Sequence, residues 1–251
     1  MGPSTAKIPF FQIILPVVGL FCLFCSIPMF CEASEALDAQ SGRIIVLDPG
    51  HGGDDFGAKG EKGTLEKDMT LTLAQALANH LRSQFKVLLT RNDDHHLPIP
   101  DRTSLANHHK ADLFVSLHLG GSFTPETNAC LITYYSSERT EKTEWNNDIN
   151  KLSNSEEMAS ALWNQLQLEH IPTSRRMAES LQRLLLNQLA DTKPMVDGSS
   201  LYVLEGATMP AILIEPFYIT HPNAEAQYQS PRELEKLAQK LAHGISMIME
   251  N

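Results

Sequence analysis

The stretch RIIVLDPGHGGDDFGAKG, residues 43–60, places an apolar run of strand length directly before a loop that contains five glycines. Glycines adopt backbone angles that other residues resist, and they let a ligand approach the chain closely. His51 stands alone among them, and an imidazole at a strand end is a natural metal ligand or acid–base group. This stretch therefore predicts a buried strand that ends in a functional site.

Similar apolar runs recur along the chain and alternate with amphipathic segments, such as residues 67–85, 174–189 and the last segment from Ser230. The length and composition of the runs predict strands. The alternation predicts one α/β domain, with a mostly parallel or mixed central sheet of about six strands flanked by helices. The predicted strands are RIIVL (43–47), KVLLT (86–90), LFVSL (113–117), CLITYY (130–135), LYVL (201–204) and AILIE (211–215).

The last helix has the clearest start signal. Ser230 is a good N-cap, Pro231 suits the first helical position, and Glu233 completes a capping box. The apolar residues that follow recur at helical spacing and predict one buried face. They are Leu234, Leu237, Leu241, Ile245 and Ile248.

The first 36 residues differ in composition from the rest of the chain. Lys7 precedes the apolar stretch 8–31, and small and acidic residues follow it. This pattern predicts a signal peptide at 1–36, with Ala33 or Ala36 as its last residue. An uncleaved membrane anchor is the alternative, because a spanning helix needs about 20 apolar residues. We therefore expect an exported protein, with the periplasm as the preferred compartment.

Charge and cysteine content narrow the range of partners. The formal net charge of −10 argues against general electrostatic binding to nucleic acid or to anionic lipid. Three of the four cysteines lie in the leader, so cleavage would leave Cys130 alone and without a disulfide. We expect a hydrophobic core to supply the stability, and nothing in the sequence requires more than a monomer.

Polar residues at the predicted strand ends form a candidate site. His51 follows the first run, His118 follows the third, Glu215 ends the sixth, and Glu66 lies at the start of the first strong helix. Ligands of open α/β sheets bind beyond such strand ends. Two histidines and a glutamate can hold zinc, and a further glutamate can serve as a base. Alternatively, the histidines are packed polar residues and Glu66 is a charge favoured by the helix dipole.

Three segments resemble, in order, the zinc-dependent N-acetylmuramoyl-L-alanine amidases of bacterial cell-wall turnover. The resemblance covers nearly all of residues 43–227, and it implies that residues 41–251 form an amidase catalytic domain. The segments are VLDPGHGGDDFGAKGEKGTLEKDMTL, VLLTRNDD with the later DRTSLANHHKADLFVSLH, and LYVLEGATMPAILIEPFYITHP.

The resemblance also implies a role for each site residue. The histidine of DPGHGG, the glutamate of EKD and the histidine of VSxH bind zinc in this family, which corresponds here to His51, Glu66 and His118. The glutamate of the PAxLxE run is the catalytic base, here Glu215. The implied substrate is peptidoglycan, and the bond cut joins muramic acid to the L-alanine of the stem peptide.

The chain departs from the family pattern in three places. Gly120 stands where relatives usually have asparagine, Glu205 stands where many have arginine, and bulky residues follow Glu215 in EPFYITHP where a glycine is common. A lost amide at position 120 could weaken a hydrogen bond that orients a ligand or a contact with the glycan. These departures concern substrate preference, since all four residues of the candidate site are present.

The polar insertion at 136–172 has two interpretations. Some relatives hold an extra helix across the zinc groove until an activator protein withdraws it, and residues 156–168 could form such a helix, with Glu156 or Glu157 near the metal. The alternative, which we favour, is a solvated loop followed by a surface helix. Long loops often act as lids, but the sequence alone does not show that this one packs over the zinc groove.

Two other functions stay open at this point. One is a catalytically silent protein that keeps the fold and binds peptidoglycan or regulates its turnover, which Gly120 supports. The other is a zinc peptidase that cuts within the stem peptide. The pairs His95–His96 and His108–His109 are a weaker hypothesis for a second metal site, because adjacent side chains point different ways and are expected to be exposed.

Overall fold

The computed structural model describes Gly2 and residues 42–124, 126–136, 155–186, 188–189 and 192–250. The predicted signal peptide at 1–36 lies outside the described residues, apart from Gly2. So do residues 137–154 of the predicted insertion. None of the helices in the described part of the chain is long and apolar enough to cross a membrane.

A six-stranded mixed sheet forms the centre of the domain, with the strand order β2-β1-β3-β6-β4-β5. The first four strands in this order run parallel, whereas β4 pairs antiparallel with β6 and parallel with β5. The predicted α/β domain with a mixed sheet is confirmed. The strands are β1 (Ile44–Pro49), β2 (Lys86–Leu89), β3 (Leu113–Leu117), β4 (Cys130–Tyr135), β5 (Pro194–Ser199) and β6 (Ala211–Glu215).

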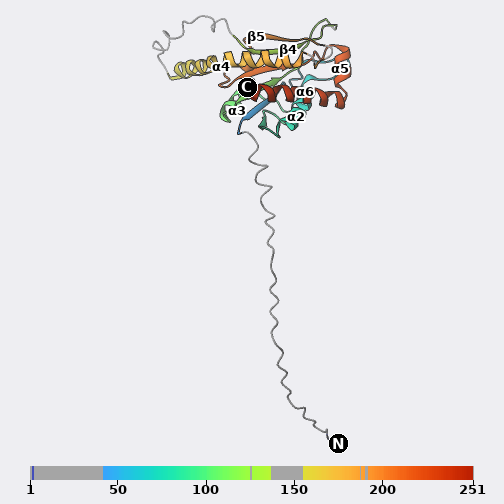
Figure 1. Ribbon diagram of the computed structural model, residues 1–251, viewed down its shortest axis with the longest axis horizontal. Coiled ribbons are helices and arrows are strands. Elements are labelled where there is room, and N and C mark those ends of the chain that lie inside the picture. The colour runs from blue at the N-terminus through green and yellow to red at the C-terminus, as the bar shows by residue number, and fades with distance from the viewer. Residues whose placement is uncertain are drawn as a thin grey trace, which may run out of the picture.

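Helices cover the two faces of the sheet unequally (Figure 1). On one face, α2 (Glu66–Leu81), α4 (Ser155–Leu185) and α6 (Pro231–Glu250) pack on the larger hydrophobic core, with α5 (Pro222–Tyr228) beside it. The other face carries a smaller core under α3 (Ile99–His108) and the short 3₁₀ turn η4 (Tyr202–Leu204). This thinner layer leaves room on that face for a cavity at the sheet.

Helix α6 begins where its sequence predicted. Its first residue is Pro231, and the backbone carbonyl of Ser230 accepts hydrogen bonds from the amides of Glu233 and Leu234. All five apolar residues predicted to face the core are buried. Because each such side chain stabilises the fold by roughly 1.5–3 kcal/mol when fully buried, α6 contributes strongly to the larger core.

The predicted strand at 201–204 is wrong. Tyr202–Leu204 forms the 3₁₀ turn η4, in which Leu204 is buried under the smaller core while Tyr202 is 57% exposed. The strand in this region is β5, whose sequence PMVDGS has no apolar run and includes glycine and aspartate, which are depleted in strands. β5 is an edge strand, and its pairing with the apolar β4 decides its conformation.

The helix predicted at 174–189 is the second half of a longer one. Helix α4 begins at Ser155 and ends at Leu185, with Pro172 inside it. The sequence also did not single out α3, which buries Arg102, Thr103 and Ala106 rather than an apolar stripe. Such a helix is held by polar tertiary contacts, which hydrophobic periodicity does not detect.

We expect the Cys130 thiol to be inert in the native protein. Cys130 is fully buried at the start of β4, and burial, followed by the negative charge of Glu215, raises its pKa to about 12. Since the thiolate is the reactive form, a thiol reagent at pH 8 should modify Cys130 in denaturant and leave it unmodified in buffer. Mass spectrometry of the peptide that contains Cys130 measures this, and rapid native labelling would contradict the burial.

Candidate active site

The four predicted site residues come from four different elements of the fold. His51 lies two residues after the end of β1, His118 directly follows β3, Glu66 is the first residue of α2, and Glu215 is the last residue of β6. β1, β3 and β6 are parallel neighbours, so their carboxyl ends meet at one edge of the sheet. The topology therefore brings together residues that are up to 164 positions apart in the sequence.

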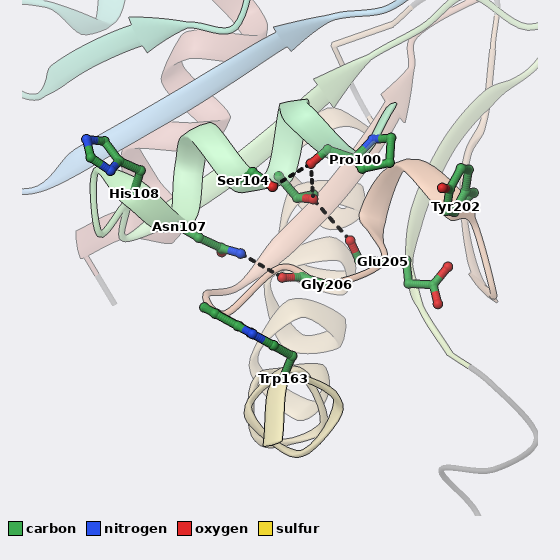
Figure 2. Close-up of a pocket in the computed structure, with 9 residues that line it drawn as sticks. Pro100, Ser104, Asn107, His108, Trp163, Tyr202, Glu205 and Gly206 are labelled. Atoms are coloured by element: carbon green, nitrogen blue, oxygen red, sulfur yellow. Dashed lines mark hydrogen bonds between the residues drawn. The ribbon is translucent and has the colours of Figure 1, made fainter. Parts of the chain in front are cut away.

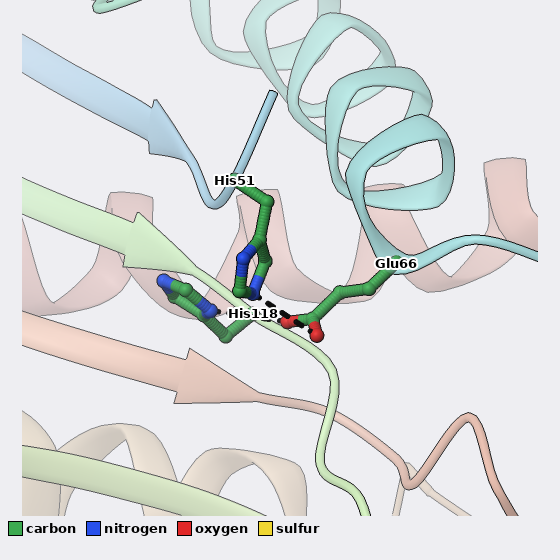
Figure 3. A group of neighbouring side chains, drawn as sticks. All are labelled: His51, Glu66 and His118. Atoms are coloured by element: carbon green, nitrogen blue, oxygen red, sulfur yellow. Dashed lines mark hydrogen bonds and ion pairs between the residues drawn. The ribbon is translucent and has the colours of Figure 1, made fainter. Parts of the chain in front are cut away.

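Two histidines and a carboxylate converge at this edge (Figure 3). One potential ligand atom from each of His51, Glu66 and His118 lies within 4.8 Å of the other two. The Glu66 carboxylate lies between the imidazoles, 3.1 Å from Nε2 of His51 and 3.0 Å from Nδ1 of His118. The two rings meet edge to face, with centroids 4.9 Å apart.

Glu66 is held by its backbone surroundings as well as by the histidines. Its two carboxylate oxygens accept hydrogen bonds from the backbone amides of Ala58 (2.8 Å) and Leu119 (2.9 Å). Burial alone would raise the pKa of Glu66, but the hydrogen bonds and charges of His118 and His51 outweigh it, so the pKa lies well below its ordinary value. Glu66 is therefore an ionised, oriented carboxylate.

Glu215 has the opposite electrostatic setting. Burial raises the pKa of its carboxyl group, the negative charge of Glu66 raises it further, and His118 opposes this only in part. Two carboxylates in one site thus have pKa values pushed apart, an arrangement that assigns them different chemical roles. Glu66 suits a permanent anion and Glu215 suits a group that gains and loses a proton.

The cavity beside these residues has a volume of about 490 Å³. Its lining includes His51, His118 and Glu215, together with residues of β4, β5, β6, α3 and η4. The register pairs Leu131 of β4 with Glu215, so the cavity lies on the sheet face that α3 and η4 cover only partly. A ligand in this cavity would contact the sheet, the two histidines and Glu215 together.

A cluster of buried charges behind His51 was missed by the sequence analysis. Arg102 of α3 donates hydrogen bonds to the backbone carbonyls of Pro49 (2.8 Å) and His51 (2.9 Å), and its guanidinium pairs with Asp48 at 2.9 Å. Arg91, just after β2, also donates to the carbonyls of Pro49 and Gly50. These contacts hold His51 in a left-handed conformation with φ of 62°, which is costly for a residue other than glycine.

Two glycines of the opening stretch are required by close packing at the site. A Cβ atom at Gly50 would lie 2.4 Å from the His118 ring. A Cβ at Gly57, which has φ of 66°, would lie 2.6 Å from the Glu66 carboxylate and from the His51 ring. Any side chain at either position would displace one of the converging residues.

Two of the departures from the family pattern contact each other. A Cβ atom added at Gly120 would lie 2.0 Å from the Tyr218 ring. The backbone amide of Gly120 donates to Phe217, and the Gly120 carbonyl accepts from the amide of Ile219. The bulky segment after Glu215 thus occupies the space that a side chain at position 120 would need.

We expect Gly120→Asn to destabilise the protein by about 1–3 kcal/mol, because it overpacks this contact. The second change Tyr218→Ala should remove the clash and recover most of the loss. Urea unfolding of the two single variants and the double variant measures the coupling. Additive losses in the double variant would show that Tyr218 is not the obstacle.

The remaining histidine pairs lie on the surface. His95, His96, His108 and His109 are all exposed, as expected. Within the described ranges, no group of three potential ligands other than His51, Glu66 and His118 comes together.

The described part of the insertion includes the first half of α4, which contacts the segment around η4. Gln167 of α4 donates to the Leu204 carbonyl (2.6 Å) and accepts from the Gly206 amide (3.0 Å), which ties the helix to the segment after η4. The side chains of Glu156 and Glu157, predicted as candidates to approach the metal, lie outside the described residues.

The fold and the matched residues define the class of protein. Residues 45–247 match the family described as N-acetylmuramoyl-L-alanine amidase, and the chain belongs to this family of hydrolases. The resemblance drawn from the sequence is thereby confirmed.

Individual relatives agree with this assignment. The chain is 27% identical over 224 residues to N-acetylmuramoyl-L-alanine amidase AmiA of Escherichia coli K12, a match that covers 84% of this chain and 78% of AmiA. Its structure is similar to that of amidase AmiC2 of Nostoc punctiforme, with a TM-score of 0.66, 25% identity and coverage of 84% and 99% of the two chains. The amidase of Clostridium difficile 630 gives a TM-score of 0.65 at 26% identity, with coverage of 84% and 98%.

Proposed function

We propose that this protein is a zinc-dependent amidase that hydrolyses the amide bond between the lactyl group of N-acetylmuramic acid and L-alanine in peptidoglycan. Membership of the amidase family supports the reaction and the substrate class. The observation that carries the proposal is the convergence of His51, Glu66 and His118 within 4.8 Å, in contact with a cavity that Glu215 also lines.

The residues present fit a zinc ion. Two imidazoles and one carboxylate are a donor set used by catalytic zinc sites, which have three protein ligands and one open position. The ionised state of Glu66 and its two backbone hydrogen bonds give a ligand that is charged and oriented before metal binds. Zinc held by His51, Glu66 and His118 would supply Lewis-acid polarisation of the scissile carbonyl and a water of lowered pKa.

Asp55 and the arginine cluster support the proposed ligands. The Asp55 carboxylate lies 2.9 Å from Nδ1 of His51, at ion-pair distance but outside hydrogen-bond geometry. Carboxylates and carbonyls around a metal-binding histidine fix the orientation of its ring. Asp55 would orient the His51 imidazole while Arg102 holds its backbone.

Glu215 would move the proton in this reaction. As a carboxylate it accepts a proton from the attacking water, and as a carboxylic acid it passes that proton to the nitrogen of L-alanine when the amide bond breaks. The products are a free lactyl carboxyl group on the glycan and a free amino group on the stem peptide. The raised pKa of Glu215 makes it a stronger base than an exposed glutamate.

Metal removal tests the proposed zinc site. A chelator should abolish the release of stem peptides from purified peptidoglycan, and added zinc should restore it. His118→Ala should lower the zinc content well below the expected value of about one ion per chain, because it removes one of three ligands. Elemental analysis measures the content, with the exposed His243→Ala as control. Unchanged zinc content in His118→Ala would rule out this site.

The masses of the digestion products separate the alternative functions. An amidase releases whole stem peptides with a free L-alanine amino terminus, whereas a peptidase leaves L-alanine attached to the glycan. A silent binding protein releases nothing even when zinc is bound. Release of intact stem peptides by the parent protein therefore supports the proposal against both.

We also infer that the protein is exported, with residues 1–36 as a cleaved signal peptide and the periplasm as its compartment. The composition of this segment supports the inference. N-terminal sequencing of protein recovered from the expressing bacterium should begin after Ala33 or Ala36. A start at residue 1 or 2 would indicate a retained anchor.

An activator protein that acts on residues 136–172 is a further hypothesis, which addition of cell extract to a silent preparation would test.

A further inference from the structure

A second cavity, of about 760 Å³, lies beside the catalytic one, between α3, η4 and the first half of α4. Figure 2 shows the α3 residues Pro100, Ser104, Asn107 and His108 on one side, Trp163 of α4 opposite them, and Tyr202 and Glu205 at the end. Glu205, one of the three departures from the family pattern, therefore lines this cavity and not the one that holds His51 and Glu215.

Some of the residues that line this cavity form hydrogen bonds within the fold, and others have exposed side chains. Asn107 is committed to the fold, since it donates to the Gly206 carbonyl and accepts from Thr208. The Glu205 backbone carbonyl accepts from Thr103, but its carboxylate is exposed. Trp163 and Tyr202 are 48% and 57% exposed, although aromatic side chains are usually covered. The cavity thus presents two aromatic rings and a carboxylate to solvent.

The two cavities are adjoining parts of one surface. Tyr202 lines both of them. Along α3, Ile99 and Arg102 line the catalytic cavity, while Pro100 and Thr103 line the second one. A substrate longer than the catalytic cavity can therefore pass Tyr202 and continue into the second cavity.

The chemistry of the lining selects the part of the substrate that fits there. A pyranose ring packs its C–H face on an aromatic ring and offers hydroxyl groups to a carboxylate or imidazole, and sites with aromatic walls and a few polar groups are typical of such ligands. The described lining contains no lysine or arginine, and Glu205 would repel the carboxylates of a stem peptide. A neutral sugar fits this lining better than a peptide does.

Resting on the function proposed above, we infer that this second cavity binds the glycan strand of peptidoglycan next to the muramic acid that is cut. Trp163 and Tyr202 would stack on sugar rings, and Glu205 would accept hydrogen bonds from their hydroxyl groups. The enzyme would then act preferentially on polymeric strands and less well on a single disaccharide peptide.

The test compares two substrates: peptidoglycan with long glycan strands, and a single N-acetylglucosaminyl-N-acetylmuramoyl peptide. Trp163→Ala in the full chain should lower the ratio of kcat/KM on the polymer to that on the disaccharide peptide about three- to tenfold, mainly through KM on the polymer. Glu205→Gln should lower the ratio less. Leu186→Ala, an exposed position just beyond the last residue of α4, should leave the ratio unchanged.

A binding measurement keeps this inference separate from the proposed function. Calorimetry with chitotetraose, a glycan without peptide, should give heat of binding that Trp163→Ala removes, whether or not the protein cleaves peptidoglycan. If the parent does not bind chitotetraose, or if Trp163→Ala binds it equally well, the glycan site is wrong. An equal fall of kcat/KM on both substrates in Trp163→Ala would also overturn it, since it would indicate a structural role for Trp163.

Discussion

Glu215→Gln is expected to lower kcat on peptidoglycan by about 10²- to 10⁴-fold while the bound zinc remains. The substitution keeps the size of the side chain and removes its ability to accept a proton. Glu215 lines the cavity together with His118. The described contacts that hold His51 and Glu66 do not involve Glu215, so the substitution should leave them in place. The release of stem peptides and the zinc content, measured on the same preparation, separate loss of the base from loss of the metal.

The matched control for this experiment is Glu250→Gln, an exposed glutamate at the end of α6. It makes the same chemical change far from the cavity and should leave both activity and zinc content unchanged. If Glu215→Gln keeps more than about a tenth of the parent kcat, another group accepts the proton and the assigned role of Glu215 is wrong.

Arg102→Met is expected to cost about 3–5 kcal/mol of stability, because it breaks a buried ion pair. Asp48 is fully buried, and its carboxylate accepts from Thr90 (2.6 Å), Ser116 (2.8 Å) and Arg102 (2.9 Å). Removing the guanidinium leaves this charge buried without its partner. It also frees the backbone carbonyl of His51, so the variant should bind zinc more weakly than the parent.

Urea unfolding and a zinc titration measure the two effects of Arg102→Met. Lys236→Ala serves as the control, since it breaks an exposed ion pair with Glu233 on α6 and should be indistinguishable from the parent. The double change Asp48→Asn with Arg102→Met should be less destabilised than Arg102→Met alone, because it removes the unpaired charge. A loss of less than about 1 kcal/mol in Arg102→Met would refute the role of this ion pair.

Much of the fold was predictable because it depends on local patterns. Five of the six predicted strands are present, and α6 begins at Pro231 with its predicted face buried. The errors occur where local composition and tertiary context disagree. LYVL is as apolar as a strand but serves as a turn that covers the smaller core, and PMVDGS is a poor strand sequence that pairs with β4.

The candidate site was predicted as a set of residue types but not as a geometry. His51, Glu66, His118 and Glu215 were selected at strand and helix ends and by the family resemblance. Arg91 and Arg102 were not linked to the site, although the resemblance spans both. Arginines in a helix or after a strand are usually exposed, so composition does not reveal that these two are buried against the carbonyls at 49–51.

The sequence by itself determined the fold class, the last helix, the family and the residues that can bind metal, because these follow from periodicity, capping signals and short motifs. The tertiary structure decided the edge position of β5, the convergence of His51, Glu66 and His118 from separate elements, the contact of Tyr218 with Gly120, and the second cavity at Trp163. Each of these depends on contacts between residues far apart in the chain, and the packing of the whole domain sets their distances.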